Sequence, residues 1–135
     1  MNIDLSTGTP ASPERTLHLA ETAAEIFRCL NHATLDSAAF GYPDGTDRVL
    51  REIGTAVSRI PQLLSQIARW NALEDAAGRI GVTSGEWAGR PHTAVTALQD
   101  RLDTARATAE ALAADLKYAA HVTSDMTARE VDGGE

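Results

Sequence analysis

The stretch VTALQDRLDTARATAEALAADLKYA, residues 95–119, decides the fold. Its apolar residues recur at alternating steps of three and four, the spacing of a helix that packs lengthwise against another helix. The sequence therefore predicts a long helix over residues 91–122 with one apolar seam. The residues of this seam are Val95, Leu98, Leu102, Ala105, Ala109, Leu112, Leu116 and Ala119.

A second apolar stripe with the same spacing predicts a helix over residues 47–77. Pro61 lies in its middle, where it removes one backbone hydrogen bond and crowds the preceding turn. Because the stripe keeps its phase across the proline, we expect one kinked helix rather than two, ending at Gly78. The stripe consists of Val49, Ile53, Ala56, Ile60, Leu63, Ile67 and Trp70.

The two stripes are predicted to face each other in an antiparallel hairpin. Residues 78–91 contain four glycines and a proline and read as the connecting loop. With the turn centred there, Leu102 is expected opposite Ile67 and Leu116 opposite Ile53. Other expected pairs, Ala105 with Leu63 and Ala109 with Ile60, set a small side chain against a large one, as close-packed layers require.

A third helix is predicted over residues 13–35, because Ser12 followed by Pro13 is a typical helix start. Its apolar face would cover the open side of the hairpin. We therefore expect an all-α protein, a three-helix antiparallel bundle. Residues 1–12 are expected to be a flexible arm, residues 13–122 a single helical-bundle domain, and residues 123–135 a flexible acidic tail.

Composition narrows the classes of function. The 135 residues have a formal net charge of −7, and the basic side chains are scattered singly, which argues against a nucleic-acid partner. No apolar run approaches the roughly 20 residues that span a bilayer, so no membrane association is expected. The N-terminus does not resemble a secretory signal, and we expect a cytoplasmic protein. The single cysteine, Cys29, leaves no internal disulfide.

No set of residues predicts catalysis. Cys29 and His32 share a helical face, but no second pair completes a zinc site, and a small thiol beside a polar histidine is the better interpretation. His18, Glu21 and Glu25 also share a face, which we interpret as solvated. The sequence predicts no catalytic residue, no cofactor and no metal, and thus a protein that is not an enzyme.

The loop contains the most specific short pattern, Trp87-Ala88-Gly89. It resembles the Trp-x-Gly turn of the WXG100 (ESAT-6-like) family of helical hairpins. That resemblance implies export through a type VII secretion system as a homodimer or heterodimer. The family's export pattern places an acid four residues after a tyrosine, whereas Tyr118 is followed by Val122.

A broader resemblance involves AEIFRCLNHATL, residues 24–35, and DRVLREIGTAVSRIPQLLSQIARW, residues 47–70. These stretches look like those of small uncharacterised helical proteins from streptomycetes and related actinobacteria, and they imply no activity. We expect a non-enzymatic module that binds a protein partner or a second copy of itself. A WXG-type secreted protein is the alternative. The candidate contact residues are Trp87, Gly89 and Tyr42.

Overall fold

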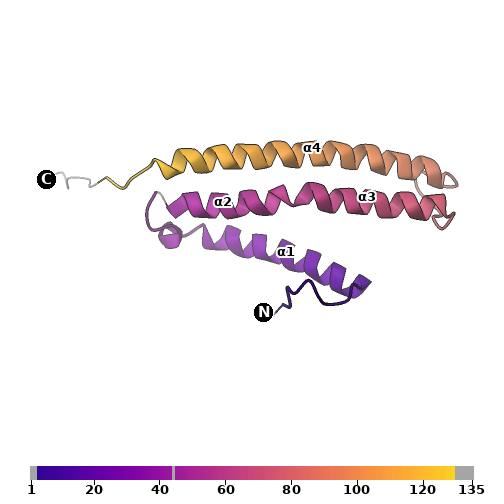
Figure 1. Ribbon diagram of the computed structural model, residues 1–135, viewed down its shortest axis with the longest axis horizontal. Helices are drawn as coiled ribbons and strands as arrows, with labels where there is room; N and C mark the ends of the chain where they lie inside the picture. The colour runs from indigo at the N-terminus through magenta and orange to yellow at the C-terminus, as the bar shows by residue number, and fades with distance from the viewer. Residues whose placement is uncertain (1–2, 44, 130–135) are drawn as a thin grey trace. The chain divides into compact units, whose positions relative to one another are not determined.

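A computed structural model describes residues 3–43 and 45–129, and within these residues every regular element is helical (Figure 1). The chain divides into two compact units, residues 1–41 and residues 42–135, and each is described by itself. The first contains α1 (Pro13–Ala33) and the 3-10 helix η1 (Ser37–Ala39). The second contains α2 (Gly45–Ser58), α3 (Ile60–Ala76) and α4 (Pro91–Ser124).

The predicted all-α class is confirmed, and so are the helices predicted at the two ends of the sequence. Both begin at the predicted proline, and their last residues differ from the prediction by two. The middle and last predicted helices form the expected hairpin, with α2 and α3 both packed along α4 (Figure 1). The packing of the first helix on this hairpin stays a prediction.

The first unit begins with a hydrogen-bonded turn. The carboxylate of Asp4 accepts from the backbone N–H of Ser6 at 2.8 Å and from the hydroxyl of Thr9 at 2.7 Å. Arg15 in α1 donates to the Ser6 carbonyl at 2.9 Å. Ser12 caps α1 as predicted, since its hydroxyl accepts from the Arg15 N–H at 3.1 Å. These bonds attach part of the predicted arm to the first turn of α1.

The second unit has a thin apolar core along α4. Its buried apolar residues among those described are Val57, Val95, Ala109 and Ala120. Helices α2 and α4 lie close together at Gly54, where an added Cβ would make an ordinary van der Waals contact of 3.6 Å with the Cβ of Leu116. The spacing at this point therefore leaves room for an alanine side chain on α2.

The middle helix is divided, and the prediction of one continuous kinked helix is corrected at this point. The division falls at Arg59, two residues before Pro61, and Arg59 itself keeps right-handed helical angles, with φ −87° and ψ −14°. Pro61 has no N–H to offer the carbonyl of Val57, and its ring crowds the turn before it. The helix therefore breaks at a single residue, while α3 continues along α4 (Figure 1).

Gly78 ends α3 close to where the sequence predicts. Its N–H donates to the Asp75 carbonyl at 2.9 Å, and the N–H of Arg79 donates to the Glu74 carbonyl at 2.9 Å. This pair of bonds is a Schellman motif, which requires a left-handed residue after the helix. Gly78 supplies it with a φ of 71°.

Two glycine substitutions are predicted to act in opposite directions. Gly54→Ala fits without strain and reduces the freedom of the unfolded chain, so it should raise the free energy of unfolding by about 0.5–1 kcal/mol. Gly78→Ala forces a side chain into a left-handed conformation and should lower the free energy of unfolding by about 1 kcal/mol. Urea unfolding followed by circular dichroism measures both changes. A loss of stability in Gly54→Ala would contradict the packing of α2 on α4.

The Asp4 turn predicts a measurable titration. The Thr9 hydroxyl and then the Ser6 N–H stabilise the carboxylate, which lowers the pKa of Asp4 to about 2 from its ordinary 3.8. Because the folded pKa is the lower one, the turn is fully formed above pH 3.8 and is lost as the pH falls through about 2. Thr9→Val should bring the pKa of Asp4 back toward 3.8, as measured by NMR titration of its side chain. An unchanged value in this variant would show that the hydroxyl does not bind the carboxylate.

Candidate interaction surface

The loop between α3 and α4 is held together by its own hydrogen bonds. The N–H of Gly89 donates to the Val82 carbonyl at 2.8 Å, and the N–H of Arg90 donates to the Trp87 carbonyl at 2.9 Å. The guanidinium of Arg90 lies over the Trp87 ring, 5.5 Å from its centroid. Trp87 is half-buried, and Gly89 is exposed with a φ of 72°. The indole predicted as a contact is therefore partly covered by its own loop.

Tyr42, the third candidate contact, lies just before α2, whereas the Trp87 loop follows α3. Its side chain is exposed, and its carbonyl accepts from the N–H of Gly45 at 2.9 Å. Because α2 and α3 together separate it from the loop, the structure does not bring Tyr42 and Trp87 together (Figure 1). The predicted candidates do not form one site.

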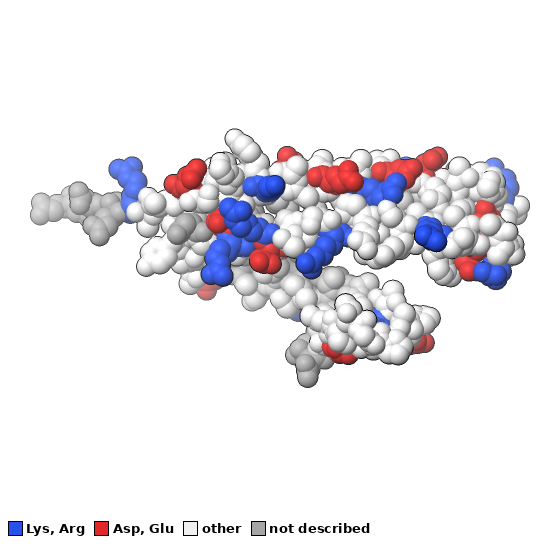
Figure 2. All heavy atoms as spheres, in the orientation of Figure 1, with Lys and Arg blue, Asp and Glu red and all other residues white. Residues whose placement is uncertain are grey.

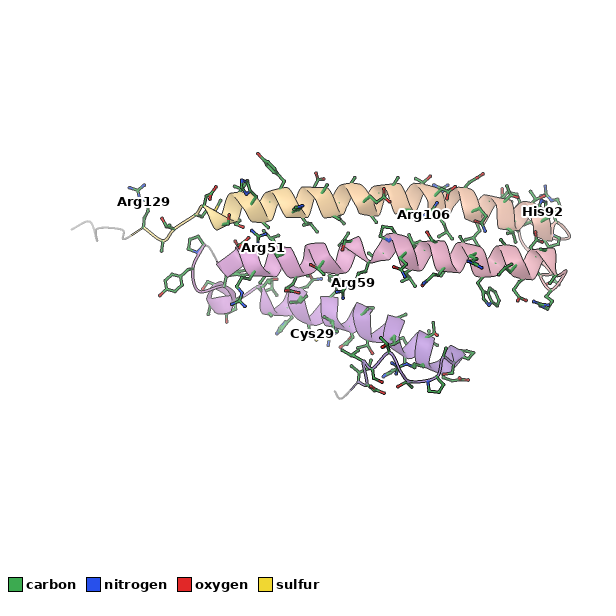
Figure 3. The ribbon with its side chains drawn as sticks, in the orientation of Figure 1. Cys29, Arg51, Arg59, His92, Arg106 and Arg129 are labelled. Atoms are coloured by element: carbon green, nitrogen blue, oxygen red, sulfur yellow. The ribbon has the colours of Figure 1, made fainter. Side chains whose placement is uncertain are left out.

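Three polar contacts join α4 to α3. The amide of Gln99 donates to the backbone carbonyl of Ala68 at 2.7 Å. The guanidinium of Arg106 donates to the hydroxyl of Ser65, also at 2.7 Å. His92 at the start of α4 lies 2.7 Å from the Asp75 carboxylate. His92 and Arg106 are labelled in Figure 3. We call these three contacts the polar clamps.

The polar clamps define the register of the hairpin and the rotation of α3. Each clamp joins residues that lie within two positions of the predicted register. The side chains of α3 on the clamped side, however, are not the predicted stripe. The residues of α3 that are at least partly covered lie mainly on a different row, made of Pro61, Leu64, Ser65, Ala68, Asn71 and Asp75, and Glu74 is partly covered as well.

The large apolar side chains of α3 are exposed, which corrects the predicted pairing. Leu63, Ile67 and Trp70 were expected to face α4, but 53%, 41% and 61% of their surfaces are accessible. Leu73 and Ile60 belong to the same row, and 56% and 37% of their surfaces are accessible. We call this row the α3 stripe; it consists of Ile60, Leu63, Ile67, Trp70 and Leu73.

On α4 the predicted seam is correct except at one position. Leu112 is exposed, whereas the seven other seam residues are buried or half-buried. The error in the pairing therefore lies in the rotation of α3 and not in the choice of the α4 face.

One signal in the sequence could have revealed the α3 stripe. Val57, Leu64 and Ala68 form a second row beside the larger residues, and together the two rows make an apolar face too wide for a single partner helix. The second row also has the smaller residues, which suit close packing on the alanine-rich α4. The prediction chose the row with the larger side chains.

A shallow groove lies between α2 and α4, with a volume of about 450 Å³. Gly54 and Ala113 lie in its apolar part, and Arg51 and Lys117 supply positive charge. Arg51 is already paired with Asp47 at 2.8 Å. The hydroxyls of Thr55 and Ser58 also have partners, the carbonyls of Arg51 and Thr55. Most polar groups of the groove are thus occupied within α2.

Charged side chains of both signs alternate over the face of the second unit that Figure 2 shows. Cys29 is exposed in α1. Within the described residues, no group of three or more His, Cys, Asp or Glu side chains is placed to hold a metal ion. None of the helices in that part of the chain combines the length and the apolar character needed to cross a membrane.

Comparison with protein-family models, with curated proteins and with solved structures gives no match. The α3 stripe is therefore interpreted from its own geometry.

Two adjacent leucines test the rotation of α3. Leu64 is half-buried on the row that contains Ser65 and Ala68, so Leu64→Ala should lower the free energy of unfolding by about 1–2 kcal/mol. Leu63 is exposed, so Leu63→Ala should change it by less than about 0.5 kcal/mol. Urea unfolding of dilute protein measures both, with the two variants serving as matched controls. A larger loss of stability in Leu63→Ala than in Leu64→Ala would show that Leu63 faces α4, as the sequence predicts, and that the α3 stripe is not exposed.

Proposed function

We propose that this chain is a non-enzymatic module that binds another protein through the α3 stripe. The observation behind the proposal is the row of five large apolar side chains on one exposed helical face. Isolated exposed apolar residues are ordinary, but a contiguous row of them is typical of a contact surface. Trp70 is the most exposed of the five, and tryptophan is a frequent anchor of binding energy at protein interfaces.

The shape of the stripe suits a helical partner. Its members are separated by three or four residues and therefore form one ridge along α3. An amphipathic helix binds such a ridge by placing its own apolar side chains beside it. The polar clamps support this role, because they fix the rotation of α3 and keep the ridge in one orientation.

Photocrosslinking in cells of the source organism tests the proposal. The photoreactive residue benzoylphenylalanine is placed at Leu63 on the stripe or, as the matched control, at Tyr118, an exposed position on α4. We expect a discrete covalent adduct from position 63 and none from position 118, because only the stripe has a bound protein. No adduct at position 63, or equal adducts at both positions, would overturn the proposal.

A further inference from the structure

Four of the five residues of the α3 stripe pair with one another when one copy is reversed, and the fifth, Ile67, then faces Gln66. Leu63 and Trp70 lie at equal distances from the midpoint between Gln66 and Ile67, and Ile60 and Leu73 do so as well. Two antiparallel α3 helices centred on this midpoint therefore place Leu63 against Trp70, and Ile60 against Leu73. Each contact then occurs twice, as a two-fold symmetric interface requires.

The charges at the two ends of the stripe follow the same symmetry. Arg59 lies one turn before Leu63, and Glu74 lies one turn after Trp70, at equal distances from the midpoint. In the antiparallel arrangement, Arg59 of each copy faces Glu74 of the other. A parallel arrangement would instead place like charges together, which is unfavourable.

Arg59 is exposed and available for this contact, whereas the Glu74 side chain is only 20% exposed. Arg59 makes no ion pair within the described residues. Glu74 is already bonded to Arg79 at 2.7 and 2.9 Å, but a carboxylate has acceptor positions for more than one guanidinium.

We propose that the partner of the α3 stripe is a second copy of this chain, bound through antiparallel α3 helices centred between Gln66 and Ile67. This inference rests on the proposed function, and it names the partner and the register. Five side chains that are about half exposed offer roughly 500 Å² per copy. An interface of this size lies at the small end of specific ones, so the dimer forms reversibly at micromolar concentrations.

Sedimentation of the full chain measures this association. We expect monomers at about 1 μM and mainly dimers at about 200 μM. Leu63→Asp places a charge in the apolar contact and should keep the protein monomeric at the higher concentration. Tyr118→Asp, at an exposed position of α4, should dimerise like the unsubstituted chain. Association that persists in Leu63→Asp, or a strict monomer at every concentration, would overturn the inference.

Fluorescence shows whether the dimer uses the stripe. In a Trp87→Phe background, Trp70 is the only tryptophan. Its emission should move to shorter wavelength as the protein becomes more concentrated, because Leu63 of the second copy covers the indole. Dimerisation without this shift would place the interface elsewhere and overturn the inference.

Cysteine crosslinking tests the register in a Cys29→Ser background. Chains with Ile60→Cys, mixed with chains with Leu73→Cys, should form a disulfide under mild oxidation, because the two positions face each other across the interface. Neither variant should crosslink efficiently alone. Efficient crosslinking of each variant with itself would indicate parallel helices and overturn the register.

The outcomes separate this inference from the proposed function. A monomeric chain that still crosslinks in cells from position 63 to a different protein overturns the homodimer and leaves the α3 stripe as an interaction surface. A monomeric chain without that crosslink overturns both.

Discussion

The rotation of α3 about its own axis determines the surface of the hairpin, and the polar clamps set that rotation. Gln99 binds the Ala68 carbonyl and Arg106 binds the Ser65 hydroxyl, and these bonds are directional, unlike apolar contacts. Turning Leu63 and Trp70 toward α4 would carry Ser65 and Ala68 away from their partners. Partly buried polar groups would then lose hydrogen bonds, which costs about 1–3 kcal/mol for each group left unsatisfied. A few polar atoms thus keep the large apolar side chains on the outside.

The sequence was sufficient for the first and last helices, for the hairpin and for its register to within two positions, because these depend on spacing, capping and the placement of glycine and proline. Ser12, Pro13, Gly78 and Pro91 mark helix ends through local chemistry alone. The rotation of α3 was not predictable in this way. Two apolar rows lie side by side on that helix, and the choice between them depends on side-chain contacts with α4 across the hairpin. The candidate site was missed for the same reason, since Trp70 and Leu63 had been assigned to the interior.

The thin core and the exposed stripe are related features of the second unit. Two layers of helix enclose little volume, and the buried apolar residues described there are small: two valines and two alanines. The larger side chains of α3 therefore find no interior position. A protein that covers them adds to the stability of the folded chain in proportion to its concentration and affinity. Binding and folding are coupled in such an arrangement.

The single-residue division at Arg59 affects how the hairpin opens. Because Pro61 cannot donate to the Val57 carbonyl, the ladder of backbone hydrogen bonds is interrupted between α2 and α3. The two helices also contact α4 differently, α2 through Val57 and Gly54 and α3 through the polar clamps. Amide hydrogens of α3 should therefore exchange with solvent as a cooperative group separate from those of α2. The proline thus makes α3, which contains the exposed stripe, an independent opening segment within an otherwise continuous layer.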